Sequence, residues 1–309
     1  MKTAVIGPGA LGSLFAAGMS AKAGSKVWML DYDKERAASL KNTIILKEGT
    51  EEYEAAVVAT ADPFKIGNAD LVLLCVKSFA VKEALARASS LFHSSTLLIA
   101  FQNGINHLET IKQADLPGYS ALGITSEGAT LLAPGKVSHL GIGRTSLGFM
   151  NEPDQKGWQK LEEAGRLFAI AGFNNVLVSN IQNCLWEKLL VNAAINGLTV
   201  IYDCNNGGLL ADQQVKELMS RAIKEGAAVA RTLGIDPGPD PVTYTREVCT
   251  KTAENISSML QDIRRGKSTE ISAINGALVA KAEALGIEAP VNRMIADRVR
   301  EIERQRCQE

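Results

Sequence analysis

The sequence has few cysteines for its 309 residues, and they form no recognisable pairing pattern. No Cys-x-x-Cys pair occurs, and the five thiols are scattered along the chain at Cys75, Cys184, Cys204, Cys249 and Cys307. Disulfide frameworks and zinc sites need paired or closely spaced cysteines. The sequence therefore predicts free thiols and no metal site.

Long apolar runs are also absent. Runs such as residues 71–76 and 97–101 are far shorter than the ~20 residues that cross a bilayer. No apolar signal segment with a small-residue cleavage site precedes the strand-like residues 2–6. We therefore expect a cytoplasmic protein that has no membrane partner.

Charge of one sign is not in excess, because 33 basic residues stand against 34 acidic ones and the formal net charge is -1. This balance argues against nucleic acid and anionic membrane surfaces as partners. The hydrophobic share of 46% and the charged share of 22% are typical of globular proteins. The length is sufficient for two domains of ordinary size.

The first part of the chain alternates strand-like and helix-like segments. A strand, a glycine loop, a helix and a second strand are predicted at residues 2–6, 7–12, 11–23 and 26–30. Further strands, a helix and a last short strand are predicted at residues 69–76, 96–100, 121–149, 156–171 and 175–178. This alternation predicts βαβ units and a mostly parallel sheet.

Strand patterns end near residue 178, and long helical patterns follow. These helices are predicted at residues 181–200, 208–233, 240–264, 268–285 and 290–306. The predicted fold class is an α/β Rossmann dinucleotide-binding domain over residues 1–178, followed by an all-α helical domain over 179–309 that binds substrate and carries out catalysis. The amphipathic helix 208–233 is a candidate homodimer face.

The glycine-rich loop Gly7-Pro8-Gly9-Ala10-Leu11-Gly12 follows the first strand and opens the first helix. In that context, Gly-x-Gly-x-x-Gly indicates a dinucleotide site. Gly7 allows the tight turn, Gly9 allows the pyrophosphate to approach, and Gly12 allows helix and strand to pack closely. The helix N-terminus supplies backbone NH groups for the phosphates. We therefore predict that these six residues bind the cofactor.

Asp31, at the end of the second strand, bears on which cofactor binds. A carboxylate there can accept hydrogen bonds from both ribose hydroxyls of NADH and repels a 2′-phosphate. Lys34 and Arg36 lie just beyond it and could pair with such a phosphate. The residues favour NADH, and they leave NADPH open.

Reduction of a carbonyl needs a proton donor, and several usual donors are missing. All three histidines, His93, His107 and His139, lie in the first predicted domain. No tyrosine has a lysine four residues later, and no ligand cluster for a catalytic metal is present. Lysine is therefore the leading candidate for the proton donor.

Lys188, Asn192 and Asn196 share one face of the helix that opens the second domain. Their spacing of four residues leaves an ammonium and two amides in a row, among largely apolar neighbours. Buried polar groups are costly unless they are paired or face a ligand. The face is therefore either a substrate site or a structural hydrogen-bond ladder.

Several sequence blocks together resemble the ketopantoate reductase family. They run in order over nearly the whole chain and comprise the glycine loop, Val76-Lys77-Ser78, Gln102-Asn103-Gly104, the Lys188/Asn192/Asn196 face, the stretch from Asn255 to Asp262, Thr269-Glu270-Ile271, Asn275-Gly276, Gly286-Ile287 and Pro290. The resemblance implies NADPH-dependent reduction of the small 2-oxo acid 2-dehydropantoate to pantoate, a step toward coenzyme A. It also implies a site in a cleft between the two domains.

The resemblance further implies roles for individual residues. Lys188 would protonate the keto oxygen, and Glu270 would pair with Lys188 and with the substrate. The remaining residues would bind the substrate or line the nicotinamide side of the cofactor, namely Asn192, Asn196 and Ser258 for the substrate and Lys77 and Asn103 for the cofactor. Composition alone favours a solvent-exposed Glu270, because residues 262–270 form a charged stretch.

Asp31 departs from the resemblance, since NADPH-binding members usually have an arginine at this position. Other readings stay open beside this one. A reductase of another 2-oxo acid, or a β-hydroxyacid dehydrogenase, would share the lysine and asparagine four residues apart. A dinucleotide sensor without catalysis would have no need to keep Lys188, Ser258 and Glu270, and a scaffold protein would have no reason to keep the form of the glycine loop.

Overall fold

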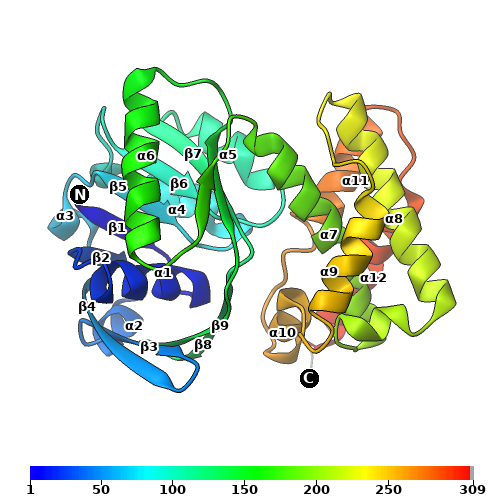
Figure 1. The fold of residues 1–309 in the computed structure, drawn as a ribbon, viewed down its shortest axis with the longest axis horizontal. Helices are drawn as coiled ribbons and strands as arrows, with labels where there is room; N and C mark the ends of the chain where they lie inside the picture. Colours follow the sequence, from blue (N-terminus) through cyan, green and yellow to red (C-terminus); the bar gives the residue numbers. More distant parts are fainter. Residues whose placement is uncertain (307–309) are drawn as a thin grey trace. The chain divides into compact units, whose positions relative to one another are not determined.

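The computed structural model describes residues 1–306, and the chain forms two compact units (Figure 1). The first unit comprises Met1–Gln102 and Leu108–Ile181, and the second comprises Asn103–His107 and the chain from Gln182 onward. The second unit thus includes a short segment from the middle of the first. Four of the predicted free thiols are free in the structure, whereas Cys307 lies outside the described residues.

Within the described residues, the first unit contains one sheet of 11 strands. The strands are β1 (Thr3–Ile6), β2 (Val27–Leu30), β3 (Thr43–Glu48), β4 (Glu51–Thr60), β5 (Leu71–Leu74), β6 (Leu97–Ala100), β7 (Tyr119–Thr125), β8 (Gly128–Ala133), β9 (Lys136–Gly141), β10 (Thr145–Phe149) and β11 (Asn175–Leu177). The centre has the order β4-β2-β1-β5-β6-β7, and every neighbouring pair in it is parallel. This is the Rossmann order, so the predicted α/β class is confirmed.

The sequence pattern predicts no strand in the β3–β4 hairpin, which is a difference from the structure. β4 begins with the polar residues Glu51-Glu52-Tyr53-Glu54, so its hydrophobic alternation is weak. β3 pairs antiparallel with β4 on one side and parallel with β9 on the other. The hairpin is therefore stabilised by a strand that lies about ninety residues away in the sequence, which local patterns cannot reveal.

Helices cover both faces of the sheet. In the first unit they are α1 (Ala10–Ala21), α2 (Lys34–Ser39), α3 (Pro63–Ile66), α4 (Val81–Arg87), α5 (Asn106–Gln113) and α6 (Gln155–Ile170), with short 3-10 turns η1 (Ser78–Ala80) and η2 (Ser89–Leu91). Figure 1 shows α6 in front of the strands, with α4 and α5 behind them. β3, β8 and β9 extend the sheet around α1 and contact it.

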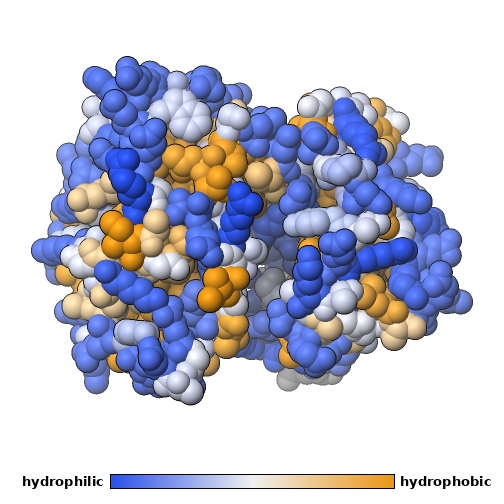
Figure 2. Space-filling view, viewed as in Figure 1, coloured by the Kyte–Doolittle hydropathy of each residue, from blue (hydrophilic) through white to orange (hydrophobic). Residues whose placement is uncertain are grey.

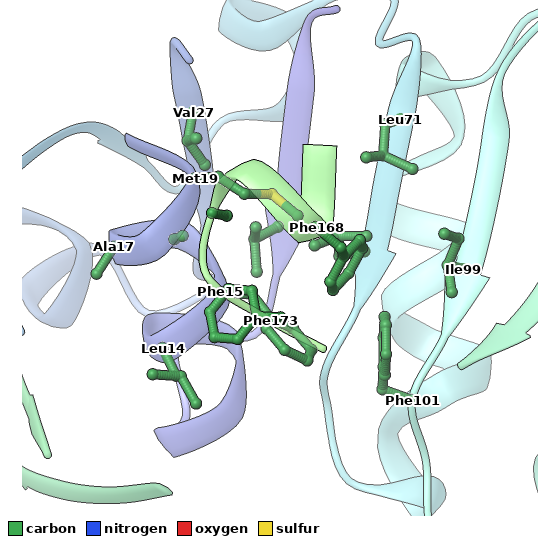
Figure 3. Close-up of a cluster of buried hydrophobic side chains, with 14 of the residues drawn as sticks. Leu14, Phe15, Ala17, Met19, Val27, Leu71, Ile99, Phe101, Phe168 and Phe173 are labelled. Atoms are coloured by element: carbon green, nitrogen blue, oxygen red, sulfur yellow. The ribbon is translucent and has the colours of Figure 1, made fainter. Parts of the chain in front are cut away.

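A cluster of aromatic rings fills the core between α1, α6 and the sheet (Figure 3). The ring of Phe15 on α1 lies 4.8 Å from that of Phe101, and 5.0 Å from those of Phe168 and Phe173, measured between centroids. Tilted and edge-on aromatic pairs at such distances stabilise a core beyond simple area burial. The glycine loop at the start of α1 is therefore anchored on a rigid element.

The second unit is helical, which confirms the predicted all-α part. Its helices are α7 (Ile181–Tyr202), η3 (Gly207–Leu210), α8 (Gln213–Thr232), α9 (Pro241–Lys251), α10 (Ser258–Arg264), α11 (Asn275–Ala284) and α12 (Pro290–Arg306). α7 is the one helix among the described residues that is long and apolar enough to cross a membrane, and 67% of its apolar window is buried inside the protein. That burial is typical of a core helix.

Two predicted helices end or begin at the wrong place. The predicted helix 240–264 is interrupted at residues 252–257, and the predicted helix 268–285 begins only at Asn275. The first interruption forms because backbone groups of Ala253 and Asn255 accept hydrogen bonds from Gly207 and Asn206. Before the second helix, the backbone NH groups of Ala273 and Ile274 both donate to the carbonyl oxygen of Glu270, and the chain forms a turn there instead of a helix. Tertiary contacts decide both boundaries.

Buried amides tie the helices of the second unit together. Asn275 on α11 donates from Nδ2 to the Ala193 carbonyl oxygen on α7 (2.9 Å) and to Asn292 Oδ1 on α12 (3.0 Å). Asn292 in turn donates to Ala222 O and Glu225 Oε2 on α8, at 2.9 and 2.8 Å. Both asparagines are fully buried. This network fixes α7 against three neighbouring helices.

Polar residues cover most of the face shown in Figure 2. On the face shown in Figure 2, hydrophilic residues predominate on both units, and apolar ones form small separate patches. Such a surface is ordinary for a globular protein.

Candidate functional site

The glycine loop has the backbone geometry that the sequence predicts. Gly7 has a φ of 97°, a left-handed conformation that glycine adopts without strain, and its NH donates to Leu30 O at 3.1 Å. A Cβ on Gly12 would lie 2.1 Å from the Gly7 carbonyl oxygen, so no larger residue fits there. A Cβ on Gly9 would meet no atom within 4 Å. The loop is thus tight at its first and last glycines and open at the middle one.

The start of α1 leaves its first NH groups available. Gly9 is the N-cap residue, and no side chain caps the helix. The first NH groups of a helix have no partner within the helix and carry the positive end of its dipole. Together with the open space over Gly9, this arrangement fits the pyrophosphate of a dinucleotide.

Asp31 is held by a neighbouring arginine rather than free for a ligand. Its side chain is 2% exposed, and its two carboxylate oxygens accept hydrogen bonds from Nε and Nη2 of Arg36. The Asp33 NH also donates to Asp31 Oδ1, at 3.1 Å. The hydrogen bond and charge of Asp31 raise the pKa of Arg36. The sequence did not predict this pair, although it named both residues.

Lys77 lies in the short segment between β5, which ends at Leu74, and η1. It is partly buried, and it is the N-cap residue of that 3-10 turn. Gln102, at the end of β6, donates from Nε2 to Leu74 O (2.8 Å) and Val76 O (3.0 Å). Gln102 therefore holds the β5 end that carries Lys77.

Three of the predicted residues of the second unit, Lys188, Asn192 and Asn196, lie on α7. Lys188 and Asn192 are partly buried, and Asn196 is 7% exposed. The Asn196 backbone carbonyl accepts a hydrogen bond from Thr199 Oγ1 at 2.9 Å. Desolvation by burial lowers the pKa of Lys188 to about 8, and the charge of Glu270 opposes this shift. A lysine with this pKa can exchange its proton near neutral pH.

Glu270 is buried, contrary to the exposure that composition alone favours. Its exposed fraction is 6%, and its Oε2 accepts a hydrogen bond from Asn103 Nδ2 at 2.9 Å. The reason is the turn at residues 270–274, which packs against the segment Asn103–His107. The charge of this buried carboxylate acts on Lys188, whose pKa it raises.

Close backbone contacts fix that packing. The Ile105 NH donates to the Ala273 carbonyl oxygen at 3.2 Å, and Asn106 Nδ2 donates to Ser272 O at 3.1 Å. Gly104 has a φ of 78°, and a Cβ on it would lie 2.1 Å from the Ala273 oxygen. Only glycine can occupy this position without a shift of the backbone.

His107 lies beside this turn and has no role in the sequence-based prediction. It is 2% exposed, and its Nδ1 has no hydrogen-bond partner among the described residues. Burial lowers the pKa of His107 to about 4, and the charge of Glu270 opposes this shift. The imidazole is therefore neutral at ordinary pH and adds no charge beside Glu270.

Ser258 is the first residue of α10 and is exposed. The residue before it, Ser257, is the N-cap, and its Oγ accepts a hydrogen bond from the Leu260 NH at 3.1 Å. No group of three or more His, Cys, Asp or Glu side chains that could hold a metal ion is found among residues 1–306.

Two family models match the chain. The model described as ketopantoate reductase PanE/ApbA matches residues 3–152, and the one described as ketopantoate reductase PanE/ApbA C terminal matches residues 180–303. The chain belongs to the ketopantoate reductase family. The predicted cofactor residues fall within the first match, and Lys188, Asn192, Asn196, Ser258 and Glu270 fall within the second.

Curated relatives in the ketopantoate reductase family match over nearly the full length. The 2-dehydropantoate 2-reductase of Halobacterium salinarum is 32% identical over 303 residues, which cover 97% of this chain and 98% of the relative. The 2-dehydropantoate 2-reductase of Pyrococcus horikoshii is 33% identical over 293 residues, which cover 94% of each chain.

Solved structures show the same fold. A PanE/ApbA family ketopantoate reductase from Ralstonia eutropha superposes with a TM-score of 0.89 at 31% identity and covers 100% of both chains. A ternary structure of D-mandelate dehydrogenase with NADH and anilino(oxo)acetate has a TM-score of 0.90 at 26% identity and covers 99% of both chains.

The sequence analysis gave no role to Gln102 or His107, two residues near the candidate site. Gln102 stands next to Asn103 in a recognised block, but its bonds to carbonyl oxygens on β5 leave no trace in the local pattern. His107 is one of only three histidines, yet its burial beside Glu270 depends on a contact 163 residues away in the sequence. Both need the folded chain to be seen.

Proposed function

We propose that this chain reduces 2-dehydropantoate to (R)-pantoate with a nicotinamide dinucleotide as hydride donor, a step of pantothenate and coenzyme A biosynthesis. The observation that carries the proposal is the α7 face, where a lysine with a lowered pKa stands in line with two asparagine amides and feels the charge of a buried carboxylate. The names of the curated relatives support the substrate.

Lys188 acts as the general acid. The bound nicotinamide supplies the hydride to the keto carbon, and the Lys188 ammonium gives its proton to the keto oxygen as negative charge develops there. Because its pKa is about 8, Lys188 is mostly protonated at neutral pH and still gives up the proton readily.

Glu270 positions that ammonium. Its charge raises the pKa of Lys188 against the desolvation that lowers it, so the lysine stays charged in a partly dry site. Asn103 holds the carboxylate through the 2.9 Å hydrogen bond from its amide. In this proposal Asn103 therefore acts on the acid through Glu270, as well as lining the cofactor side.

Asn192, Asn196 and Ser258 bind the substrate. Amide and hydroxyl groups suit the carboxylate and the terminal hydroxyl of 2-dehydropantoate, because together they offer both donors and acceptors. The partly buried α7 face strengthens such hydrogen bonds, since the local dielectric is lower than that of water.

For the cofactor we propose a preference for NADH over NADPH. The Asp31 carboxylate can exchange one Arg36 contact for the ribose hydroxyls, whereas a 2′-phosphate would lie beside that carboxylate. Arg36 is already neutralised by Asp31 and therefore offers less attraction to a phosphate. The D-mandelate dehydrogenase relative, which binds NADH, supports this choice.

A substrate panel tests the proposal. Nicotinamide absorbance is followed while the purified protein is mixed with 2-dehydropantoate or other 2-oxo acids, including an aromatic one, and with NADH or NADPH. The highest kcat/KM is expected for 2-dehydropantoate, and Lys188→Ala should lose most of the rate. A higher kcat/KM for the aromatic acid would instead favour the second candidate, a D-2-hydroxyacid dehydrogenase like the mandelate enzyme.

A further inference from the structure

A buried pair of hydroxyl groups lies one turn beyond Asn196. Thr199 on α7 is completely buried, and its Oγ1 lies 2.9 Å from the Asn196 carbonyl oxygen and 2.6 Å from Ser257 Oγ. Ser257 is 6% exposed and also accepts the Leu260 NH. The pair joins two segments that are 58 residues apart in the sequence.

Each hydroxyl has one proton, and this determines the direction of the hydrogen bonds. The Asn196 carbonyl can only accept, so Thr199 must donate its proton to it. Ser257 must then donate to Thr199 Oγ1, while its own lone pair accepts the Leu260 NH. All three contacts are satisfied in only this arrangement, which runs from the start of α10 to the backbone of α7.

The pair sits between two residues of the proposed substrate site. Asn196 is the residue to which Thr199 donates, and Ser258 directly follows Ser257. α10 has only seven residues and follows the non-helical residues 252–257, so its own helical bonding is weak. The place of Ser258 relative to Asn196 therefore depends on tertiary contacts, and this buried hydroxyl pair is one of them.

We infer that Thr199 and Ser257 are positioning residues that hold Ser258 in register with Asn196 and so determine the affinity for the 2-oxo acid. The inference rests on the proposed function. It predicts an effect on substrate binding and none on the cofactor, because both residues belong to the helical unit, whereas the glycine loop belongs to the other unit.

Thr199→Val tests this, because it keeps the shape of the side chain and removes its hydroxyl. Ser257 then loses its buried acceptor, which frees the start of α10. We expect KM for the 2-oxo acid to rise about tenfold, a typical cost of one buried hydrogen bond, with KM for the nicotinamide cofactor unchanged. Thr199→Ser restores the hydroxyl and should restore KM.

Thr245→Val is the matched control. Thr245 is also completely buried, but its hydroxyl bonds only to Pro241 O in its own helix, α9. Its substitution should cost stability without raising KM. In a Ser258→Ala background, Thr199→Val should raise KM little further, since both changes would remove the same contact. Equal KM values for wild type and Thr199→Val, or equal increases in both valine variants, would overturn the inference.

Amide hydrogen exchange tests the positioning without any turnover. Faster exchange at Leu260 and the following NH groups of α10 is expected in Thr199→Val, and not in Thr199→Ser or Thr245→Val. Unchanged exchange in Thr199→Val would refute the positioning role. A wild-type protein that reduces no 2-oxo acid would refute the proposed function instead, and the exchange result would still decide the structural part.

Discussion

At the scale of single residues, the proposed chemistry depends on the charge state of Lys188. Burial lowers the pKa of Lys188 to about 8, and the charge of Glu270 acts in the opposite direction, because it favours the protonated ammonium. The reduction direction needs the protonated ammonium, so its rate should fall as pH rises through about 8. The reverse oxidation needs the neutral amine, so its rate should rise over the same range.

Glu270→Gln removes the carboxylate that supports the ammonium. The pKa of Lys188 should then fall further, and the decline of the reduction rate should move to lower pH. A kcat–pH profile of wild type and Glu270→Gln measures this. A decline that stays at the same pH in both proteins would show that another group titrates.

Cofactor choice is a second question at this scale. Asp31→Asn removes the charge that holds Arg36, which leaves the guanidinium able to bind a 2′-phosphate. We expect the kcat/KM ratio of NADPH to NADH to increase at least about tenfold. Asp33→Asn is the control, because it removes a nearby charge that binds no side-chain atom of Arg36. An equal change in both variants would refute a specific role for the pair.

At the scale of elements, the turn at residues 270–274 and the segment Asn103–His107 form one structural feature. A Cβ on Gly104 would lie 2.1 Å from Ala273 O. Gly104→Ala should therefore cost about 3 kcal/mol of unfolding free energy and reduce activity by displacing Asn103 from Glu270. Gly24→Ala, at a φ of +61° with nothing within 4 Å, should cost less, as measured by urea unfolding. Equal losses would argue against the contact.

A buried contact between polar side chains links β3, β9 and the turn before β8. His139 is 6% exposed and lies 3.0 Å from Glu48 Oε1 and 2.6 Å from Glu127 Oε2, and the Glu127 side chain is fully buried. His139→Leu would leave Glu127 without this partner, and we expect a loss of about 3 kcal/mol in urea unfolding. His93→Leu, at a partly buried loop position, should cost less than about 1 kcal/mol. A small effect of both variants would contradict this role.

The elements that could be predicted from sequence are those with strong local signals. The βαβ unit at the N-terminus and amphipathic helices such as α6 and α12 carry clear local signals, and the structure confirms them. The β3–β4 hairpin and the break in residues 252–257 depend on partners far away in the sequence. Local patterns therefore predict the type of an element better than its ends.

At the scale of the whole molecule, the sequence predicts two parts but not how the chain is shared between them. Residues 103–107 belong to the helical unit, because Asn103 and Gly104 contact residues near position 270. Residue types and the family resemblance together identify candidate site residues. The Asp31–Arg36 pair and the Thr199–Ser257 pair became visible only through side-chain geometry.

The most direct test of the central claim compares two substrates that differ by one group. The initial rate of reduction is measured with 2-dehydropantoate and with the same 2-oxo acid lacking its terminal hydroxyl. A site whose amides and hydroxyl bind that group should prefer 2-dehydropantoate by at least about a hundredfold in kcat/KM. Equal kcat/KM values for the two acids would contradict the proposed substrate and indicate a general 2-oxo acid reductase.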